Sequence, residues 1–350
     1  MGGLPHQPFQ IIELNEFFSE LALGNESANE IRMRCKGHFL IFGDAVQRKE
    51  RGKNLHVLKL QGIVCHAPIS DNDQSALARE MGSVLPLRAA IPEEDELSGF
   101  EITSLQMAEA TKYVIATAAL LSRDYEFAIA LLEELQHTKD KLNINSNVKP
   151  IRKLIGLIPV RLADAYKFAS IDSFVRWEKT RSNSDLQKSI NWIAKFDKLN
   201  PNENLHILLV RAIGHFIFSR DIEAASKYIS RCRAKYIAEP TWKYSAAFLE
   251  AYRNNLDKAK QLYDAAKPTE SGYVMPFQIE GFIAWILDIE PQQKQLNFCL
   301  GYLNEIFKQD MISARQYYSN FLSPPCNEDF SKSAIEHAKK FMVAHKVEVR

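Results

Sequence analysis

The stretch Ser122-Arg123-Asp124-Tyr125-Glu126-Phe127-Ala128-Ile129-Ala130-Leu131-Leu132-Glu133-Glu134-Leu135 decides the fold of this chain. It joins a short polar turn to an amphipathic helix, in which Ala128 is a small residue among large apolar ones. A preceding helix can cross closely at such a position. The same pattern returns at residues 219–225 and 254–259, so the sequence predicts a helix–turn–helix unit that is repeated along the chain.

The composition is that of an ordinary globular protein, with 46% hydrophobic and 25% charged residues among 350. A formal net charge of +1 argues against a global attraction to nucleic acid or to an anionic membrane. The longest apolar runs are far shorter than the roughly 20 residues of a membrane span, and the start lacks a secretory pattern. The five scattered cysteines are typical of reduced thiols. We therefore expect a cytoplasmic protein without membrane contact.

The first hundred residues carry mixed signals. Two stretches with period-two alternation predict strands, and the polar connection between them predicts a hairpin. Helical spacing at two places, and a short apolar run before the acidic segment 92–96, predict two helices and an edge strand. The predicted segments are a helix at 9–23, strands at 38–46 and 55–64, a short helix at 76–81 and an edge strand at 85–91. We expect residues 1–100 to form a small α/β unit.

From Glu101 onward the periodicity is helical, with breaks at proline, glycine and asparagine. The small residue at the predicted crossing is Ala128, Ser189, Ala225 and Ala259 in turn. The last two intervals are close to the about 34 residues of a helical-hairpin repeat. The first interval is much longer, and an inserted helix near 151–168 would account for it. Residues 101–350 are therefore predicted to form an array of helical hairpins.

This pattern resembles the tetratricopeptide repeat (TPR) family. In that family a small residue opens the buried face of the second helix, an aromatic or aliphatic residue and another small or apolar one follow, and a proline closes the unit. Ala259, Tyr263, Ala266 and Pro268 match in that order. The resemblance implies a mainly α fold: a TPR-like solenoid preceded by a small α/β unit, like the leading segment of uncharacterised bacterial TPR proteins.

The sequence contains no Gly-x-Gly-x-x-Gly, Walker-type Gly-Lys-Ser/Thr, Gly-x-Ser-x-Gly, His-Glu-x-x-His or Cys-x-x-Cys motif, which would indicate nucleotide binding, hydrolysis or a zinc site. The pair Cys65-His66 and the acidic run 93–96 are interpreted as a strand end and a solvent-exposed link. We therefore expect no catalytic residue, no metal and no cofactor, and a chain that is not an enzyme.

The TPR resemblance places ligands on the first helix of each hairpin. Aligning the small residues puts an aromatic set with few charges on that surface, which suits an apolar protein segment. The alternative is that these aromatic residues pack between neighbouring repeats. The predicted partner-binding residues are Tyr113, Thr117, Arg211, Phe218, Tyr244, Phe248 and Tyr252. The preferred function is a non-enzymatic scaffold or adaptor for protein–protein interaction.

A second hypothesis rests on Arg48, Lys49, Arg51 and Lys53, which cluster at the predicted hairpin tip. Several cations on one loop can bind a phosphate backbone together, whereas the alternative is a solvated turn that protects a strand edge. In that hypothesis the chain is a sensor or regulatory subunit of a bacterial multi-protein system, such as a defence system, and its N-terminal unit binds a nucleotide or nucleic acid.

Overall fold

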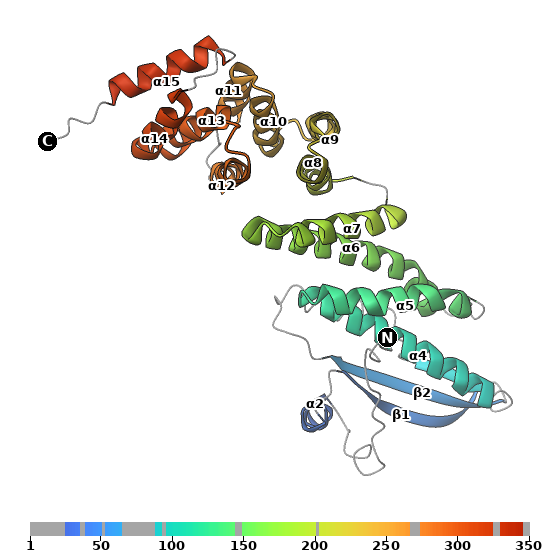
Figure 1. The fold of residues 1–350 in the computed structure, drawn as a ribbon. Helices are drawn as coiled ribbons and strands as arrows, with labels where there is room; N and C mark the ends of the chain where they lie inside the picture. The colour runs from blue at the N-terminus through green and yellow to red at the C-terminus, as the bar shows by residue number, and fades with distance from the viewer. Residues whose placement is uncertain are drawn as a thin grey trace, which may run out of the picture. The chain divides into compact units, whose positions relative to one another are not determined.

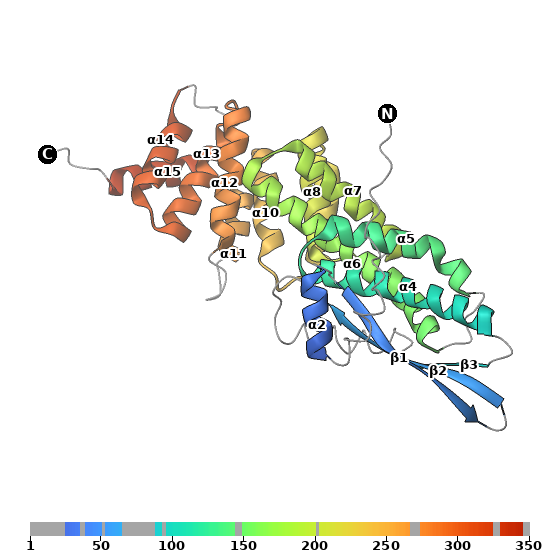
Figure 2. The same cartoon turned by 90° about the horizontal axis from the view of Figure 1, so that it is seen from below.

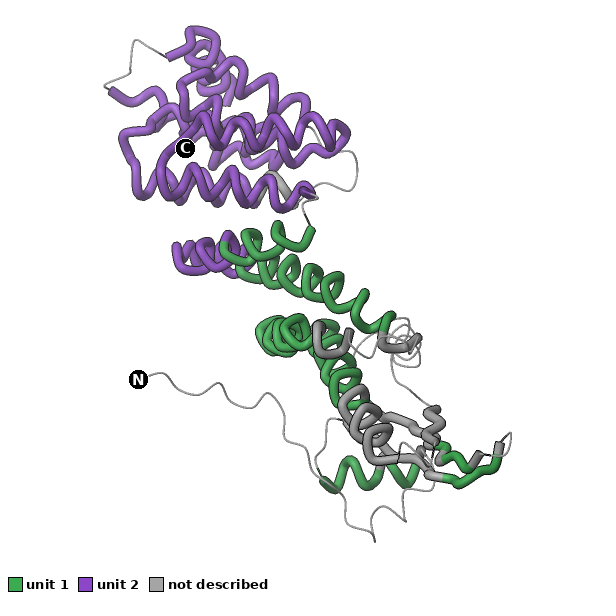
Figure 3. Tube along the Cα trace, turned by 90° about the vertical axis from the view of Figure 1, so that its right-hand side faces the viewer, with its two compact units in different colours: residues 1–173, 191–201 green, residues 174–190, 202–350 purple. Residues whose placement is uncertain are grey.

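The structure is a computed structural model and is mainly α-helical with one small sheet (Figure 1). It describes residues 25–35, 39–50, 53–64, 88–92, 96–143, 149–200, 203–266, 274–324 and 330–345. Contacts between residues divide the chain into two compact units (Figure 3). Unit 1 comprises residues 1–173 and 191–201, and unit 2 comprises residues 174–190 and 202–350.

The sheet belongs to unit 1 and has the strand order β1-β2-β3, with both pairs antiparallel. Its strands are β1 (Phe39–Glu50), β2 (Lys53–Val64) and β3 (Arg88–Pro92). The two predicted long strands are confirmed, but they extend further toward the tip than expected, because Glu50 already pairs with Lys53. The third strand lies at the edge, close to the predicted segment 85–91.

Helix α2 (Asn25–Arg34) packs against β1 and β2 and buries Ala28 and Ile31 (Figure 2). The sequence did not predict this helix, since few of its residues are apolar. The predicted helices at 9–23 and 76–81, the pair Cys65-His66 and most of the acidic run lie outside the described residues.

Helices α4 (Glu96–Leu121) and α5 (Tyr125–Asn143) form the first helical hairpin. The apolar side of α5 is fully buried, with Ala128, Leu131, Leu132 and Leu135 each 0% exposed. Helix α4 also contacts β2 and β3. The sheet and the first hairpin therefore lie in one compact unit, and the contact-based division does not coincide with the boundary expected near residue 100.

The next two helices are α6 (Lys149–Thr180) and α7 (Asn183–Leu199), and the division between the two units falls within both. The expected inserted helix near 151–168 is instead the first part of α6, which continues without a break to Thr180. The long interval between Ala128 and Ser189 thus reflects one long helix of 32 residues.

Unit 2 continues with further helices that pack as adjacent pairs (Figure 1). They are α8 (Leu205–Ser219), α9 (Ile222–Lys235), α10 (Thr241–Tyr252), α11 (Leu256–Ala265), α12 (Val274–Ile289), α13 (Gln295–Leu303), the π-helical turn η2 (Asn304–Lys308), α14 (Met311–Leu322) and α15 (Lys332–Ala344). The described residues after Pro92 contain no strand, as predicted.

Five of the turns between helices share one geometry. Each contains a single non-glycine residue with a φ between 53° and 67°, and these residues are Arg123, Arg181, Arg220, Asn254 and Gln309. In three of these turns the next residue is an aspartate. Its carboxylate accepts a hydrogen bond from a backbone N–H in the first turn of the following helix, that of Phe127, Ala224 or Ser313. The left-handed residue reverses the chain and the aspartate starts the second helix.

The small residues predicted at the helix crossings are buried. Ala128, Ser189, Ala225 and Ala259 are each 0% exposed. A residue with a short side chain lets two helix axes approach closely, and a larger one at the same place would collide with the neighbouring helix. The burial that the sequence predicted is confirmed at all four positions.

Candidate functional site

The first helices of three hairpins in unit 2 meet through aromatic rings. Phe216 on α8, Phe248 on α10 and Phe282 on α12 contact one another edge to face, with ring centroids 4.9, 4.9 and 6.3 Å apart. Tyr252 contacts Phe216 at 4.9 Å. These four residues are called the aromatic cluster below. Two of these residues, Phe248 and Tyr252, are among the predicted partner-binding residues, and their rings pack on other side chains of the chain itself.

Four of the predicted partner-binding residues are buried in the structure. Tyr113, Thr117, Tyr244 and Phe248 are between 1 and 3% exposed. The Tyr244 hydroxyl donates to the Ala266 carbonyl oxygen at 3.1 Å, and the Thr117 hydroxyl donates to the Tyr113 carbonyl oxygen at 2.9 Å. The packing alternative, that these residues belong to the interior, describes them better than an open binding surface does.

The other three predicted residues reach the surface to different degrees. Arg211 is ion-paired with Glu203, with 2.6 Å between Nη1 and Oε1. The half-buried Tyr252 donates its hydroxyl to Glu290 at 2.6 Å. Phe218, near the end of α8, is 45% exposed. Of the seven predicted residues, Phe218 offers the largest apolar area to a partner.

An arginine that the sequence analysis did not single out lies beside the aromatic cluster. The Arg181 guanidinium carbon is 4.8 Å from the ring centroid of Trp177, 5.5 Å from that of Trp285 and 5.7 Å from that of Phe282. Trp177 precedes it by one turn of α6, whereas the other two rings come from α12. We call Arg181, its three rings and the neighbouring Glu178 the Arg181 site.

The guanidinium of Arg181 makes no hydrogen bond or ion pair with any residue that the structure describes. Burial lowers the pKa of Arg181 below its usual value, and the charge of Glu178 offsets this only in part. Burial likewise raises the pKa of the Glu178 carboxyl, against the influence of Arg181. The site thus combines a partly desolvated cation, whose planar donors lack acceptors, with an aromatic support that holds it by cation–π attraction.

Trp177 lies in the last turn of α6 and Arg181 lies in the turn that follows the helix, four residues later, so a local contact between them could be expected from their separation. The contacts of Arg181 with α12 could not. Phe282 and Trp285 belong to a helix far along the chain, and no local pattern states which earlier residue they will face.

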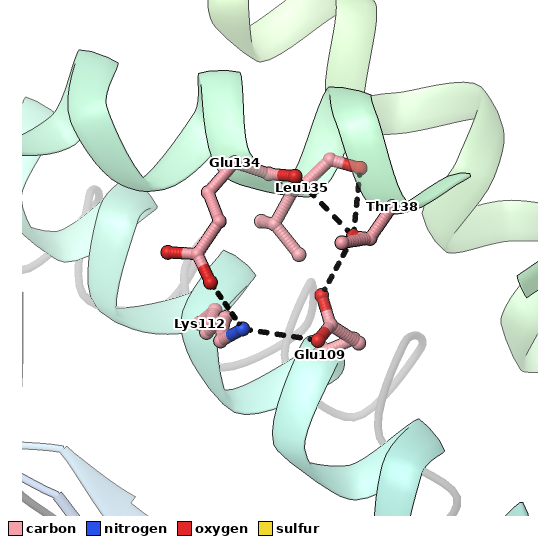
Figure 4. Close-up of polar contacts among 5 residues, drawn as sticks. All are labelled: Glu109, Lys112, Glu134, Leu135 and Thr138. Atoms are coloured by element: carbon pink, nitrogen blue, oxygen red, sulfur yellow. Dashed lines mark hydrogen bonds and ion pairs between the residues drawn. The ribbon is translucent and has the colours of Figure 1, made fainter. Parts of the chain in front are cut away.

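Other polar clusters connect helices. In unit 1, the Lys112 ammonium on α4 lies 3.0 Å from Glu109 and 2.6 Å from Glu134 on α5, and Thr138 donates to Glu109 at 3.1 Å (Figure 4). Burial alone would lower the pKa of Lys112, but the two carboxylates raise it above its usual value. This cluster is satisfied internally and joins α4 to α5.

A second cluster in unit 1 joins α5, α6 and α7. Glu133 accepts hydrogen bonds from the Tyr166 hydroxyl at 2.6 Å and from the Lys195 ammonium at 2.7 Å. Lys195 also lies over the rings of Tyr166 and Trp192, which stack on each other. Its donors and acceptors are used within the chain, so we assign it a structural role.

The basic hairpin tip is described only in part. Arg48 and Lys49 are exposed, but as consecutive strand residues they point to opposite faces of the hairpin. Lys53 is the cross-strand partner of Glu50, and Arg51 lies outside the described residues. The register therefore divides the predicted cluster between two faces. Nucleic-acid binding by this tip stays a prediction, and salt-dependent binding lost on replacing Arg48, Lys49 and Arg51 would support it.

Comparisons with known proteins add no identification: no family model matches this chain, and neither the curated proteins nor the solved structures include a significant match. Within the described ranges, no group of three histidine, cysteine or acidic side chains is placed to hold a metal ion. Nor is any helix among those residues long and apolar enough to cross a membrane.

Proposed function

We propose that this chain is a non-enzymatic scaffold or adaptor of the TPR type, which binds a segment of another protein. The observation that carries the proposal is the recurrence of one hairpin design. A turn residue in the left-handed conformation, followed by a buried small residue in the second helix, returns in successive helical pairs. Proteins built from stacked helical hairpins offer long surfaces for binding and hold them rigidly.

The partner segment contacts unit 2 near the end of α8 in this proposal. Phe218 is a large aromatic side chain with almost half of its surface exposed, and an exposed ring of this kind is a common anchor for a partner. The interior residues Tyr244 and Phe248 support the surface from below and do not touch the partner. Phe218 is therefore the residue whose replacement tests the proposal.

The test is affinity capture of partners by the full chain from extracts of the source cells, quantified by mass spectrometry. Three proteins are compared: the unchanged chain, Phe218→Asp, and Ile237→Asp as a matched control. Ile237 is 71% exposed and lies after α9, away from the end of α8, so an aspartate there adds the same charge elsewhere. We expect a partner that is retained by the unchanged chain and by Ile237→Asp and lost with Phe218→Asp.

Two outcomes would contradict the proposal. One is that the unchanged chain retains no protein above the level of an unrelated bait. The other is that Phe218→Asp and Ile237→Asp retain every partner equally well, which would remove the proposed contact. Thermal unfolding of all three proteins checks that a lost partner does not reflect lost folding.

A further inference from the structure

The side chain of Arg181 is not needed for the turn that it occupies. The turn requires a residue with left-handed backbone, and Arg123 and Arg220 occupy the corresponding places in two other hairpins. Arg123 is exposed at the end of its turn. Arg220 donates to Glu290 and to the carbonyl oxygens of Phe216 and Ile217. Three arginines with the same backbone conformation thus have three different side-chain environments. The turn alone does not explain the environment of Arg181.

No residue that the structure describes accepts a hydrogen bond from the positively charged guanidinium of Arg181. Trp177, Phe282 and Trp285 surround the guanidinium with aromatic rings. Those rings attract the cation but do not accept its five N–H groups as a carboxylate would. A partly buried charge is costly unless it is paired, since its lost hydration is otherwise not replaced. The arrangement is pre-formed for an anion that the described residues do not supply.

We infer that Arg181 binds an oxyanion, a carboxylate or phosphate group, carried by a segment of the partner protein. The planar fork of a guanidinium matches two oxygens of such a group with two parallel hydrogen bonds. The rings hold the fork in place before the ligand arrives, so little side-chain entropy is lost on binding. This inference rests on the proposed function, because it assumes that the oxyanion belongs to a protein partner.

Two neighbouring positions, Glu178 and Gly281, affect how well an anion can bind to Arg181. Glu178 lies one turn before Arg181 and competes electrostatically for its charge, so it weakens the binding of an anion. Gly281 is exposed on α12, and a Cβ atom added there would lie 4.0 Å from the Arg181 Nη2 atom. A carboxylate on a side chain at position 281 can therefore reach the guanidinium and occupy the site from within the chain.

The decisive experiment titrates the full chain, with arginine labelled by nitrogen-15, with sodium phosphate and with sodium acetate. Sodium chloride at equal ionic strength is the reference, and the nuclear magnetic resonance signal of the Arg181 Nε–H group is followed. We expect a saturable shift with either oxyanion and none with chloride. Arg181→Lys lacks this signal, so its affinity for phosphate is measured by isothermal titration calorimetry beside that of the unchanged chain. It should bind at least about tenfold more weakly, because a lysine cannot form the paired hydrogen bonds.

Matched variants separate site occupancy from a general charge effect. Gly281→Glu should weaken phosphate binding at least about tenfold relative to Gly281→Gln, which has the same size and no charge. Glu178→Gln should tighten binding. Lys179→Gln removes an exposed cation from the same helix and should leave the affinity unchanged. A shift that does not saturate, or that Gly281→Glu leaves intact, overturns the oxyanion site.

Partner capture distinguishes this inference from the proposed function. If a partner depends on Phe218 but is retained equally by Gly281→Glu and Gly281→Gln, the scaffold function stands and the oxyanion contact with the partner is wrong. If Gly281→Glu loses the partner while Gly281→Gln keeps it, both are supported. Circular dichroism of the two Gly281 variants confirms that α12 is intact in each.

Discussion

At the scale of single residues, the five turn residues show how one backbone conformation is filled by different side chains. An L-residue in the left-handed region costs about 1–2 kcal/mol relative to its usual conformation. Arginine, asparagine and glutamine bear this cost where glycine would avoid it. At Arg220 the side chain compensates, because its guanidinium is bound to Glu290 and to two backbone carbonyl oxygens. At Arg123 the structure shows an exposed side chain.

Replacing these two arginines by glycine should therefore have opposite effects. Arg123→Gly should stabilise the chain by about 0.5–1 kcal/mol, since the relief of backbone strain exceeds the added entropy of the unfolded state. Arg220→Gly should destabilise it by about 1–3 kcal/mol, because charged hydrogen bonds are lost. Urea denaturation followed by circular dichroism measures both changes. A loss of stability in Arg123→Gly would contradict the account of the turn.

Two phenylalanines should likewise differ in how much stability is lost when each is replaced by alanine, because one is buried and the other is exposed. Phe248 is 3% exposed and belongs to the aromatic cluster, so Phe248→Ala should destabilise unit 2 by about 3–5 kcal/mol. Phe218→Ala should change stability by no more than about 0.5 kcal/mol, because its ring is already largely in water. Thermal unfolding of the two variants tests this. Equal losses would mean that Phe218 is also part of the interior.

At the scale of helices, close crossings depend on residues without side-chain bulk. A Cβ atom at Gly301 on α13 would lie 2.6 Å from two ring carbons of Tyr318 on α14. Tyr318 is fully buried, and its hydroxyl is hydrogen-bonded to Glu305, so its ring has little room to move. A Cβ atom at Gly214 would meet Ile190 Cδ1 at the same 2.6 Å, but that atom is the flexible end of a side chain.

Gly301→Ala should consequently cost about 1–3 kcal/mol, as overpacking against a fixed ring does. Gly214→Ala should change stability by less than about 1 kcal/mol, because Ile190 can rotate away and alanine favours the helix. Both changes are read from urea denaturation midpoints. If Gly214→Ala were the more damaging variant, the description of the α13–α14 crossing would be wrong.

Local patterns in the sequence predicted much of this fold. Alternation predicted β1 and β2, and the small residues Ala128, Ser189, Ala225 and Ala259 predicted the buried crossings. Each of these features depends on neighbours within a few residues. The extent of α6 was missed, because the long interval before Ser189 suggested a separate, inserted helix near 151–168.

The candidate site was less predictable, for a physical reason. Family resemblance placed Tyr244 and Phe248 on an open surface, but both are buried, and Phe248 packs against Phe216 and Phe282. Such contacts join three different hairpins, and their geometry depends on the angle between helices. No spacing along the chain encodes that angle, so neither the aromatic cluster nor the complete Arg181 site could be predicted without the three-dimensional structure.

At the scale of the whole molecule, stability should depend on pH through two carboxylates, Glu133 and Glu178, whose ionised forms contribute to stability with opposite signs. Burial would raise the pKa of Glu133 in unit 1, but hydrogen bonds from Lys195 and Tyr166 lower it below its usual value. Its contribution to stability is present above the unfolded pKa of about 4.3 and is lost as the pH falls further. Burial raises the pKa of Glu178 in unit 2, so its ionised form opposes folding at neutral pH.

Two amide variants test these signs. At pH 7, Glu133→Gln should be less stable than the unchanged chain by up to about 1 kcal/mol, the scale of a partly exposed ion pair. Glu178→Gln should be more stable at pH 7. Both differences should shrink as the pH falls toward 3 and the carboxyl groups become protonated. Thermal unfolding midpoints at pH 7, 5 and 3 give the result, and a gap that does not shrink between pH 7 and pH 3 would contradict the assignment.

The aromatic cluster also has an evolutionary consequence. Phe216, Phe248 and Phe282 each touch the other two, so the cost of changing one ring depends on what occupies the other positions. A smaller side chain at one position leaves a void that a larger one at a neighbouring position can fill. In descendants of a common ancestor, these three positions should therefore change as a set that conserves total volume, even though three different helices carry them.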